Sequence, residues 1–149
     1  NVVCETGSVS NAAAATKPYK IVAFSKADGA RSWSTLSLDY SADYYAKYDA
    51  FAEVGAVACL SEKAGSAVKT KTCDFKTGGE TASLDYYATA YEVTLYEAKS
   101  GKKIKDLGTV SAPATTCPSF VSYDKSDPKV IAKPDADAVD ALLAAFVKE

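Results

Sequence analysis

The alternation of apolar and polar residues along the chain predicts a sheet built from short strands. The clearest strand covers residues 91–96, where Val93 and Leu95 lie on one face with polar neighbours between them. Residues 99–101, Lys-Ser-Gly, fit a hairpin loop with glycine in the left-handed conformation, and residues 104–110 are predicted to return as the partner strand. One face of this hairpin is expected to reach the core.

A second hairpin is predicted around Ser66. Residues 54–60 and 68–75 both have the composition of strands, and Ala-Gly-Ser lies between them as the bend. Upstream, residues 19–25 are rich in β-branched and aromatic side chains and predict the first strand. Residues 33–38 predict a second, shorter one.

The chain is predicted to end in an amphipathic helix that begins after Asp135, a suitable N-cap. An apolar stripe with the spacing i, i+3, i+4, i+7 follows it: Val139, Leu142, Leu143 and Phe146. We expect this stripe to pack on the sheet face that carries Val93 and Leu95. The preceding residues 111–134 hold four of the five prolines, which favours an extended crossing or an edge segment.

These elements predict one α+β domain over residues 18–149. Its sheet is expected to be mainly antiparallel, with two hairpins and an N-terminal strand, and to be packed by the C-terminal helix. Residues 1–17 are rich in Ser, Thr and Ala and show little periodicity, so we expect an extended arm that is mobile or lies on the surface.

Two disulfides are predicted from the four cysteines: Cys4, Cys59, Cys73 and Cys117. The chain begins at Asn1 and contains no Met, which indicates a mature protein whose signal peptide has been removed. An even number of cysteines in such a chain favours disulfides over free thiols, and we expect the protein to be secreted, outside the cell or on its surface.

The predicted hairpin suggests how the cysteines pair. When the strands are folded symmetrically about Ser66, Cys59 faces Cys73 at a separation that a disulfide can span. Cys4 then remains for Cys117. Alternatively, Cys4 pairs with a cysteine of a neighbouring chain.

Common catalytic and metal-binding chemistry has little support in this composition. The chain contains no His, which removes imidazole-based catalysis and most zinc sites, and its cysteines form no CxxC pair. It contains no nucleophile elbow, P-loop or dinucleotide motif. We therefore expect a non-enzymatic protein without a metal or cofactor.

The charge pattern argues against nucleic acid as a partner. Seventeen basic and nineteen acidic residues are interspersed and leave a net charge of −2, whereas nucleic-acid binding needs a basic surface. No apolar run approaches the ~20 residues that a transmembrane helix requires. We expect no transmembrane segment.

Aromatic residues are the one compositional excess that suggests a binding surface, and ten of them are Tyr. Their spacing within residues 39–51 is typical of a short irregular helix or of a loop fixed by aromatic side chains. Exposed rings of this kind suit protein interfaces or stacking on sugars. The candidate ligand or interface residues are Trp33, Tyr40, Tyr44, Tyr45 and Tyr48.

From Glu53 onward, about two-thirds of the chain resembles a group of small exported bacterial proteins of uncharacterised activity. The resemblance rests on the run 53–59, Cys73, the hairpin 91–102, Cys117-Pro118 and the closing helix. It implies a fold and export, and it implies no activity.

Two functions are expected from these observations. The first is an extracellular structural or interaction protein that self-assembles, as in a filament or surface layer, through an N-terminal arm containing Val2, Val3 and Cys4. Its partner is then a copy of itself or another surface protein. The alternative is a secreted module that binds a carbohydrate or another ligand through the surface Tyr and Trp residues.

Overall fold

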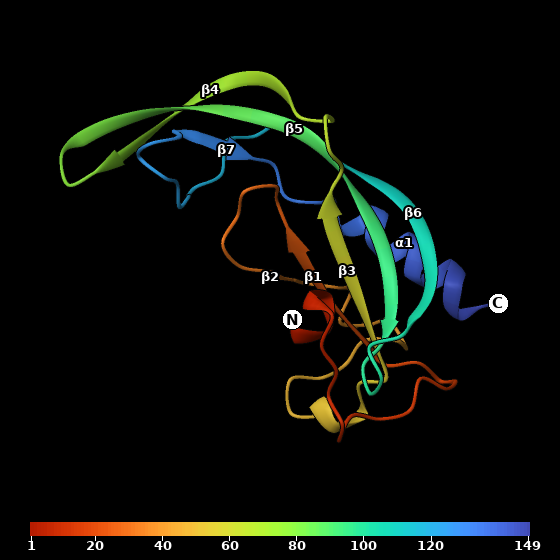
Figure 1. The fold of residues 1–149 in the computed structure, drawn as a ribbon. Helices are drawn as coiled ribbons and strands as arrows, with labels where there is room; N and C mark the ends of the chain where they lie inside the picture. The colour runs from red at the N-terminus through yellow and green to blue at the C-terminus, as the bar shows by residue number, and fades with distance from the viewer.

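The computed structural model describes residues 1–149, the side chain of Thr77 excepted. The chain forms a curled sheet of seven strands with one C-terminal helix (Figure 1). It also contains two disulfides. In chain order the elements are η1 (Val2–Glu5), β1 (Ile21–Lys26), β2 (Ser34–Leu36), η2 (Phe51–Glu53), β3 (Ala56–Glu62), β4 (Val68–Thr77), β5 (Glu80–Glu97), β6 (Lys103–Ala112), β7 (Lys129–Ile131) and α1 (Ala136–Val147). The predicted mixture of α and β structure is confirmed.

The 18-residue strand β5 is the central strand of the sheet and pairs with four others. Its N-terminal half pairs with β4 and β7, and its C-terminal half pairs with β3 and β6. Strand β1 pairs with β3, and β2 pairs with β1 at the edge. The sheet is mixed, because β1 runs parallel to β3 and β7 runs parallel to β5. The predicted mainly antiparallel sheet is wrong, since the chain passes from β1 to β3 by a long crossover rather than a hairpin.

The hairpin predicted around Ser66 does not form. Strands β3 and β4 both pair with β5 and follow one another along it: Glu62 lies opposite Tyr91, and Val68 lies opposite Ala88. The bend between them therefore carries the chain onward along β5 instead of folding β4 back onto β3. Instead, β4 forms an antiparallel hairpin with β5, the next strand in the chain.

Both predicted disulfide pairings are wrong as a consequence. The cysteines pair as Cys4–Cys59 and Cys73–Cys117. Cys59 lies opposite Thr94 of β5, whereas Cys73 lies opposite Leu84, ten residues away on the same strand. That separation corresponds to about 33 Å of strand, far beyond the ~7 Å between Cα atoms that a disulfide tolerates.

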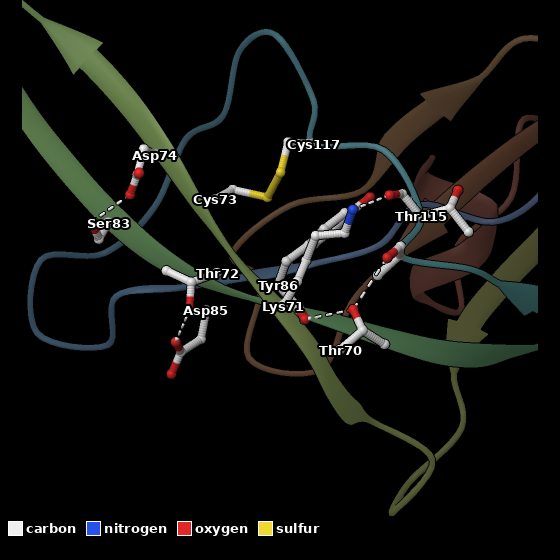
Figure 2. Close-up of a disulfide and its surroundings, with 11 residues drawn as sticks. Thr70, Lys71, Thr72, Cys73, Asp74, Ser83, Asp85, Tyr86, Thr115 and Cys117 are labelled. Carbon is white, nitrogen blue, oxygen red and sulfur yellow. Dashed lines mark hydrogen bonds between the residues drawn. A yellow bond between two sulfur atoms is a disulfide. The ribbon is translucent and has the colours of Figure 1, made fainter.

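The second disulfide ties the segment that follows β6 to β4, as Figure 2 shows. Beside it, the Thr70 hydroxyl lies 3.1 Å from the Ala114 carbonyl oxygen and 3.1 Å from the Tyr86 carbonyl oxygen. The Lys71 ammonium donates a hydrogen bond to the Thr115 carbonyl oxygen. These contacts hold the proline-rich segment against the β4–β5 hairpin.

The elements with strong local periodicity agree with the sequence. The strands β1 and β2, the hairpin of β6 with the second half of β5, and α1 form where they are predicted, but β5 begins at Glu80, eleven residues before the predicted start. Gly101 has a φ of 71°, as the hairpin loop requires. The Asp135 side chain caps α1 by accepting a hydrogen bond from the Asp137 amide.

The helix covers one face of the sheet. Val139 and Leu143 of α1 belong to the same buried cluster as Val93 and Leu95 of β5, which confirms the packing predicted for the apolar stripe. No helix in the described part of the chain has the length and apolarity needed to span a membrane.

The N-terminal arm covers the opposite face. Val3 is 4% exposed and packs with Val57 and Cys59 of β3 in a second buried cluster. The Val9 amide donates a hydrogen bond to the Ala98 carbonyl oxygen over 2.9 Å. Since β3 is buried on both faces from Ala56 to Leu60, the arm is the third layer of the fold.

Candidate functional site

The Tyr-rich segment before η2 is a loop of turns, one of the two forms that its spacing allowed. Its conformation is fixed from two sides. The Ile21 amide of β1 donates to the Tyr44 carbonyl oxygen over 2.8 Å, and the Tyr44 hydroxyl donates to Oδ1 of Asp140 in α1 over 2.5 Å. The Asp140 carboxylate also accepts from the Asp39 amide at 3.1 Å. The loop is thus connected to both the sheet and the helix.

Replacing Tyr44 by Phe is expected to lower the free energy of unfolding by about 1–2 kcal/mol, because the charged hydrogen bond to Asp140 is lost. Burial, followed by the hydrogen bond to Asp140 and its charge, raises the pKa of the Tyr44 hydroxyl. The unfolded chain ionises first, so the stability that this group contributes is complete below about pH 10 and is lost progressively as the pH rises above it. Urea denaturation at neutral and alkaline pH measures both effects.

The matched control is Tyr40→Phe. Tyr40 lies in the same loop and is 84% exposed, so its change is expected to stay within about 0.5 kcal/mol at every pH. Equal losses in the two variants would contradict the assigned role of the Asp140 contact.

The five aromatic residues predicted as a binding surface do not lie on one face. Tyr44 is buried, Tyr45 is half-buried against the main core, and Trp33 is half-buried against the cluster under the N-terminal arm. Tyr40 is exposed, and Tyr48 is 87% exposed. Only Tyr45 and Tyr48 contribute to a common pocket.

This pocket, which we call the β1–β2 pocket, has a volume of about 320 Å³. Strands β1 and β2, the two residues after β2, the aromatic loop and the start of η2 all contribute to its lining. The lining residues are Ile21, Val22, Ala23, Phe24, Thr35, Leu36, Ser37, Leu38, Tyr45, Ala46, Tyr48 and Phe51. Among these lining residues none is charged, and their polar side-chain groups are hydroxyls.

Two exposed aromatic rings stand at the β1–β2 pocket. The rings of Tyr48 and Phe51 are 5.7 Å apart and meet edge to face at 70°, and Phe51 is 59% exposed. Phe51 continues the spacing of Tyr40, Tyr44 and Tyr48 within residues 39–51, but it is not among the residues predicted as the interface.

A second depression, about 440 Å³ in volume, lies between the β1–β2 turn and residues 122–133. Three of its charged side chains already have partners within the chain: Lys129 lies 3.1 Å from the Asp127 carboxylate, and Asp124 accepts hydrogen bonds from the Ser126 hydroxyl and amide. The Ser126 hydroxyl and amide lower the pKa of Asp124. Within the described residues, no three His, Cys, Asp or Glu side chains come together as metal ligands would.

The predicted assembly residues lie in the docked arm. Val3 is buried, Val2 is 44% exposed, and Cys4 is bonded to Cys59 of the same chain. The arm lies so close to the sheet that a Cβ atom on Gly55 would come within 2.6 Å of the Ala14 carbonyl oxygen. The absence of a side chain at Gly55 therefore leaves room for the arm at this position.

Comparisons with protein-family models, with curated proteins and with solved structures found no match to this chain. The resemblance to small exported bacterial proteins stays a prediction.

Proposed function

We propose that the chain is an extracellular, non-enzymatic interaction protein that binds a partner protein at the β1–β2 pocket. The observation that carries this proposal is the pair of exposed rings, Tyr48 and Phe51, beside an uncharged pocket. Exposed apolar groups gathered at a concave site are typical of binding surfaces. The two disulfides fit an oxidising environment outside the cell.

The energetics of covering aromatic rings support binding at this site. An aromatic ring buries about 150–250 Å² when it is covered, and Tyr is among the residues that contribute most to protein interfaces. The rings of Tyr48 and Phe51 already contact each other, so a partner covers both at once. The absence of charge among the lining residues also avoids the cost of desolvating an ion on binding.

Site-specific crosslinking tests the proposal. A photoreactive phenylalanine analogue at position 48 is expected to crosslink a partner in the extracellular protein mixture of the source cells, and the yield should fall when Phe51 is replaced by Ala. The same analogue at position 40, which is equally exposed, is the control. Equal yields at the two positions would contradict the proposed site.

Self-assembly through the N-terminal arm is the second candidate, supported by the separate layer that the arm forms on β3. An arm exchanged between copies would make the same contacts as the docked arm, which is the usual basis of domain swapping. Because Cys4 is bonded to Cys59 of its own chain, exchange requires this bond to form between chains instead.

Oxidative refolding of two differently tagged chains together distinguishes a Cys4–Cys59 bond within one chain from the same bond between two chains. Exchange is expected to give covalent heterodimers or longer ladders on non-reducing gels, all collapsing to monomer on reduction. A single monomer band at every protein concentration rejects assembly through the arm, and it leaves binding at the β1–β2 pocket unaffected.

A further inference from the structure

We infer that the β1–β2 pocket takes an extended, uncharged peptide segment, which adds to the open edge of β2 as a further strand. The inference rests on the proposed function and names the chemistry of the partner. It follows from three features of the molecule: the open edge of β2, the way in which the other edges are protected, and the lining of the pocket.

The edge of β2 is free to pair. Strand β2 pairs with β1 through Ser25–Ser34, Phe24–Thr35 and Ala23–Leu36, and in the part of the chain that the structure describes no other strand pairs with it. An edge strand presents backbone N–H and C=O groups that another strand can use. Peptides bind to many sheets in this way, with backbone hydrogen bonds giving affinity and side-chain pockets giving specificity.

The other edge strands carry features that oppose such pairing. Strand β4 carries Lys69, Lys71 and Lys76, and its register with β5 shifts between Lys69 and Lys71. Strand β6 carries lysines and has two register shifts, and β7 carries Lys129. Lysines and bulges on edge strands prevent unwanted association.

Strand β2 has neither feature, and only its length of three residues limits the number of backbone hydrogen bonds that a partner strand can form. Its residues are Ser34, Thr35 and Leu36, none of them charged, and its register with β1 is regular. The contrast with β4, β6 and β7 indicates that β2 is the edge left open for a partner strand.

The β1–β2 pocket adjoins this strand. Thr35 and Leu36 of β2 line the pocket together with Tyr48 and Phe51. Side chains alternate along a strand, so a strand paired with β2 turns every second side chain toward one face. Those side chains fill the pocket, where the uncharged lining favours apolar groups and disfavours charged ones.

The same lining favours a peptide over a sugar. The rings of Tyr48 and Phe51 meet at 70° and do not form one flat stacking platform. The polar side chains of the pocket are hydroxyls, with no carboxylate or amide side chain among the lining residues to fix the hydroxyl groups of a sugar. Binding of a glycan would therefore contradict the peptide assignment, and the test below includes it.

Selection from a display library of random peptides of about ten residues on the full-length oxidised protein tests the inference. Selected peptides are expected to be uncharged, with apolar residues at alternate positions. They are then resynthesised with N-methyl groups on alternate backbone amides, in both registers. Methylation in the register that faces β2 is expected to weaken binding about tenfold or more, whereas the other register changes it little.

Two variants connect the binding to the site. The double variant Tyr48→Ala/Phe51→Ala is expected to lose the selected peptides, and Tyr40→Ala/Phe120→Ala, which removes the same residue types at exposed positions elsewhere, is expected to keep them. Circular dichroism verifies that both variants are folded.

The outcomes separate the inference from the proposed function. Peptides that need Tyr48 and Phe51 but tolerate methylation in both registers overturn strand addition and keep the pocket as an interaction site. Oligosaccharides that bind in place of peptides on a glycan array overturn the peptide assignment. Selected peptides that ignore the double variant overturn the inference, and crosslinking at position 48 then decides the proposed function independently.

Discussion

Removing the Cys4–Cys59 disulfide by the paired change Cys4→Ala/Cys59→Ala is expected to lower the free energy of unfolding by about 4 kcal/mol. The bond joins residues 55 positions apart, and the loss of loop-closure entropy from the unfolded chain gives this magnitude. The arm is also expected to separate more often from β3, because this bond is its covalent link to the sheet. Urea denaturation measures the first effect.

Hydrogen exchange at the Val9 amide measures the second effect, since this amide donates to the Ala98 carbonyl oxygen only while the arm is docked. The control is Cys73→Ala/Cys117→Ala. Its bond spans 44 residues, so a similar loss of stability is expected, with little change in exchange at Val9. Peptide mapping that found Cys59 bonded to Cys73 would contradict the assigned pairing and the prediction together.

Replacing Leu143 by Ala is the second change expected to have a large effect, a loss of about 3–5 kcal/mol in the free energy of unfolding. Leu143 is 0% exposed and packs in the main core with β5. Truncation removes apolar burial and leaves a cavity that the rigid sheet beneath α1 fills poorly. Thermal and urea denaturation followed by circular dichroism measure the loss.

Leu142→Ala is the matched control, because it makes the same chemical change one position earlier in the same helix. Leu142 is half-buried, so a loss of about 1 kcal/mol is expected. Equal losses for the two leucines would mean that α1 does not present Leu143 to the sheet as described.

The elements that the sequence predicts correctly are those specified by neighbours in the chain. The stripe of α1 and its cap at Asp135 depend on side chains within a few turns of one helix. The β5–β6 hairpin depends on alternation in two adjacent strands and on Gly101 between them. Periodicity and turn chemistry act locally, so a single sequence is enough to read them.

The path from β3 to β4 has no such local determinant. The bend at residues 64–66 is compatible with a hairpin and equally with a chain that continues along a third strand. The choice follows from β5, whose 18 residues pair with β3 over one half and with β4 over the other. Burial of both faces of β3 by α1 and the arm stabilises this arrangement. The pattern of neighbouring residues in the sequence does not reveal that burial.

The candidate site shows the same division. The sequence by itself determined that residues 39–51 concentrate aromatic side chains and that four cysteines form two disulfides. Only the tertiary structure decided which rings are buried: Tyr44 finds Asp140 in α1, 96 residues away, whereas Tyr48 stays exposed beside Phe51. Composition and spacing are local properties of the chain. Burial, disulfide partners and an open strand edge depend on which distant segments meet, and that is fixed by the packing of the whole sheet.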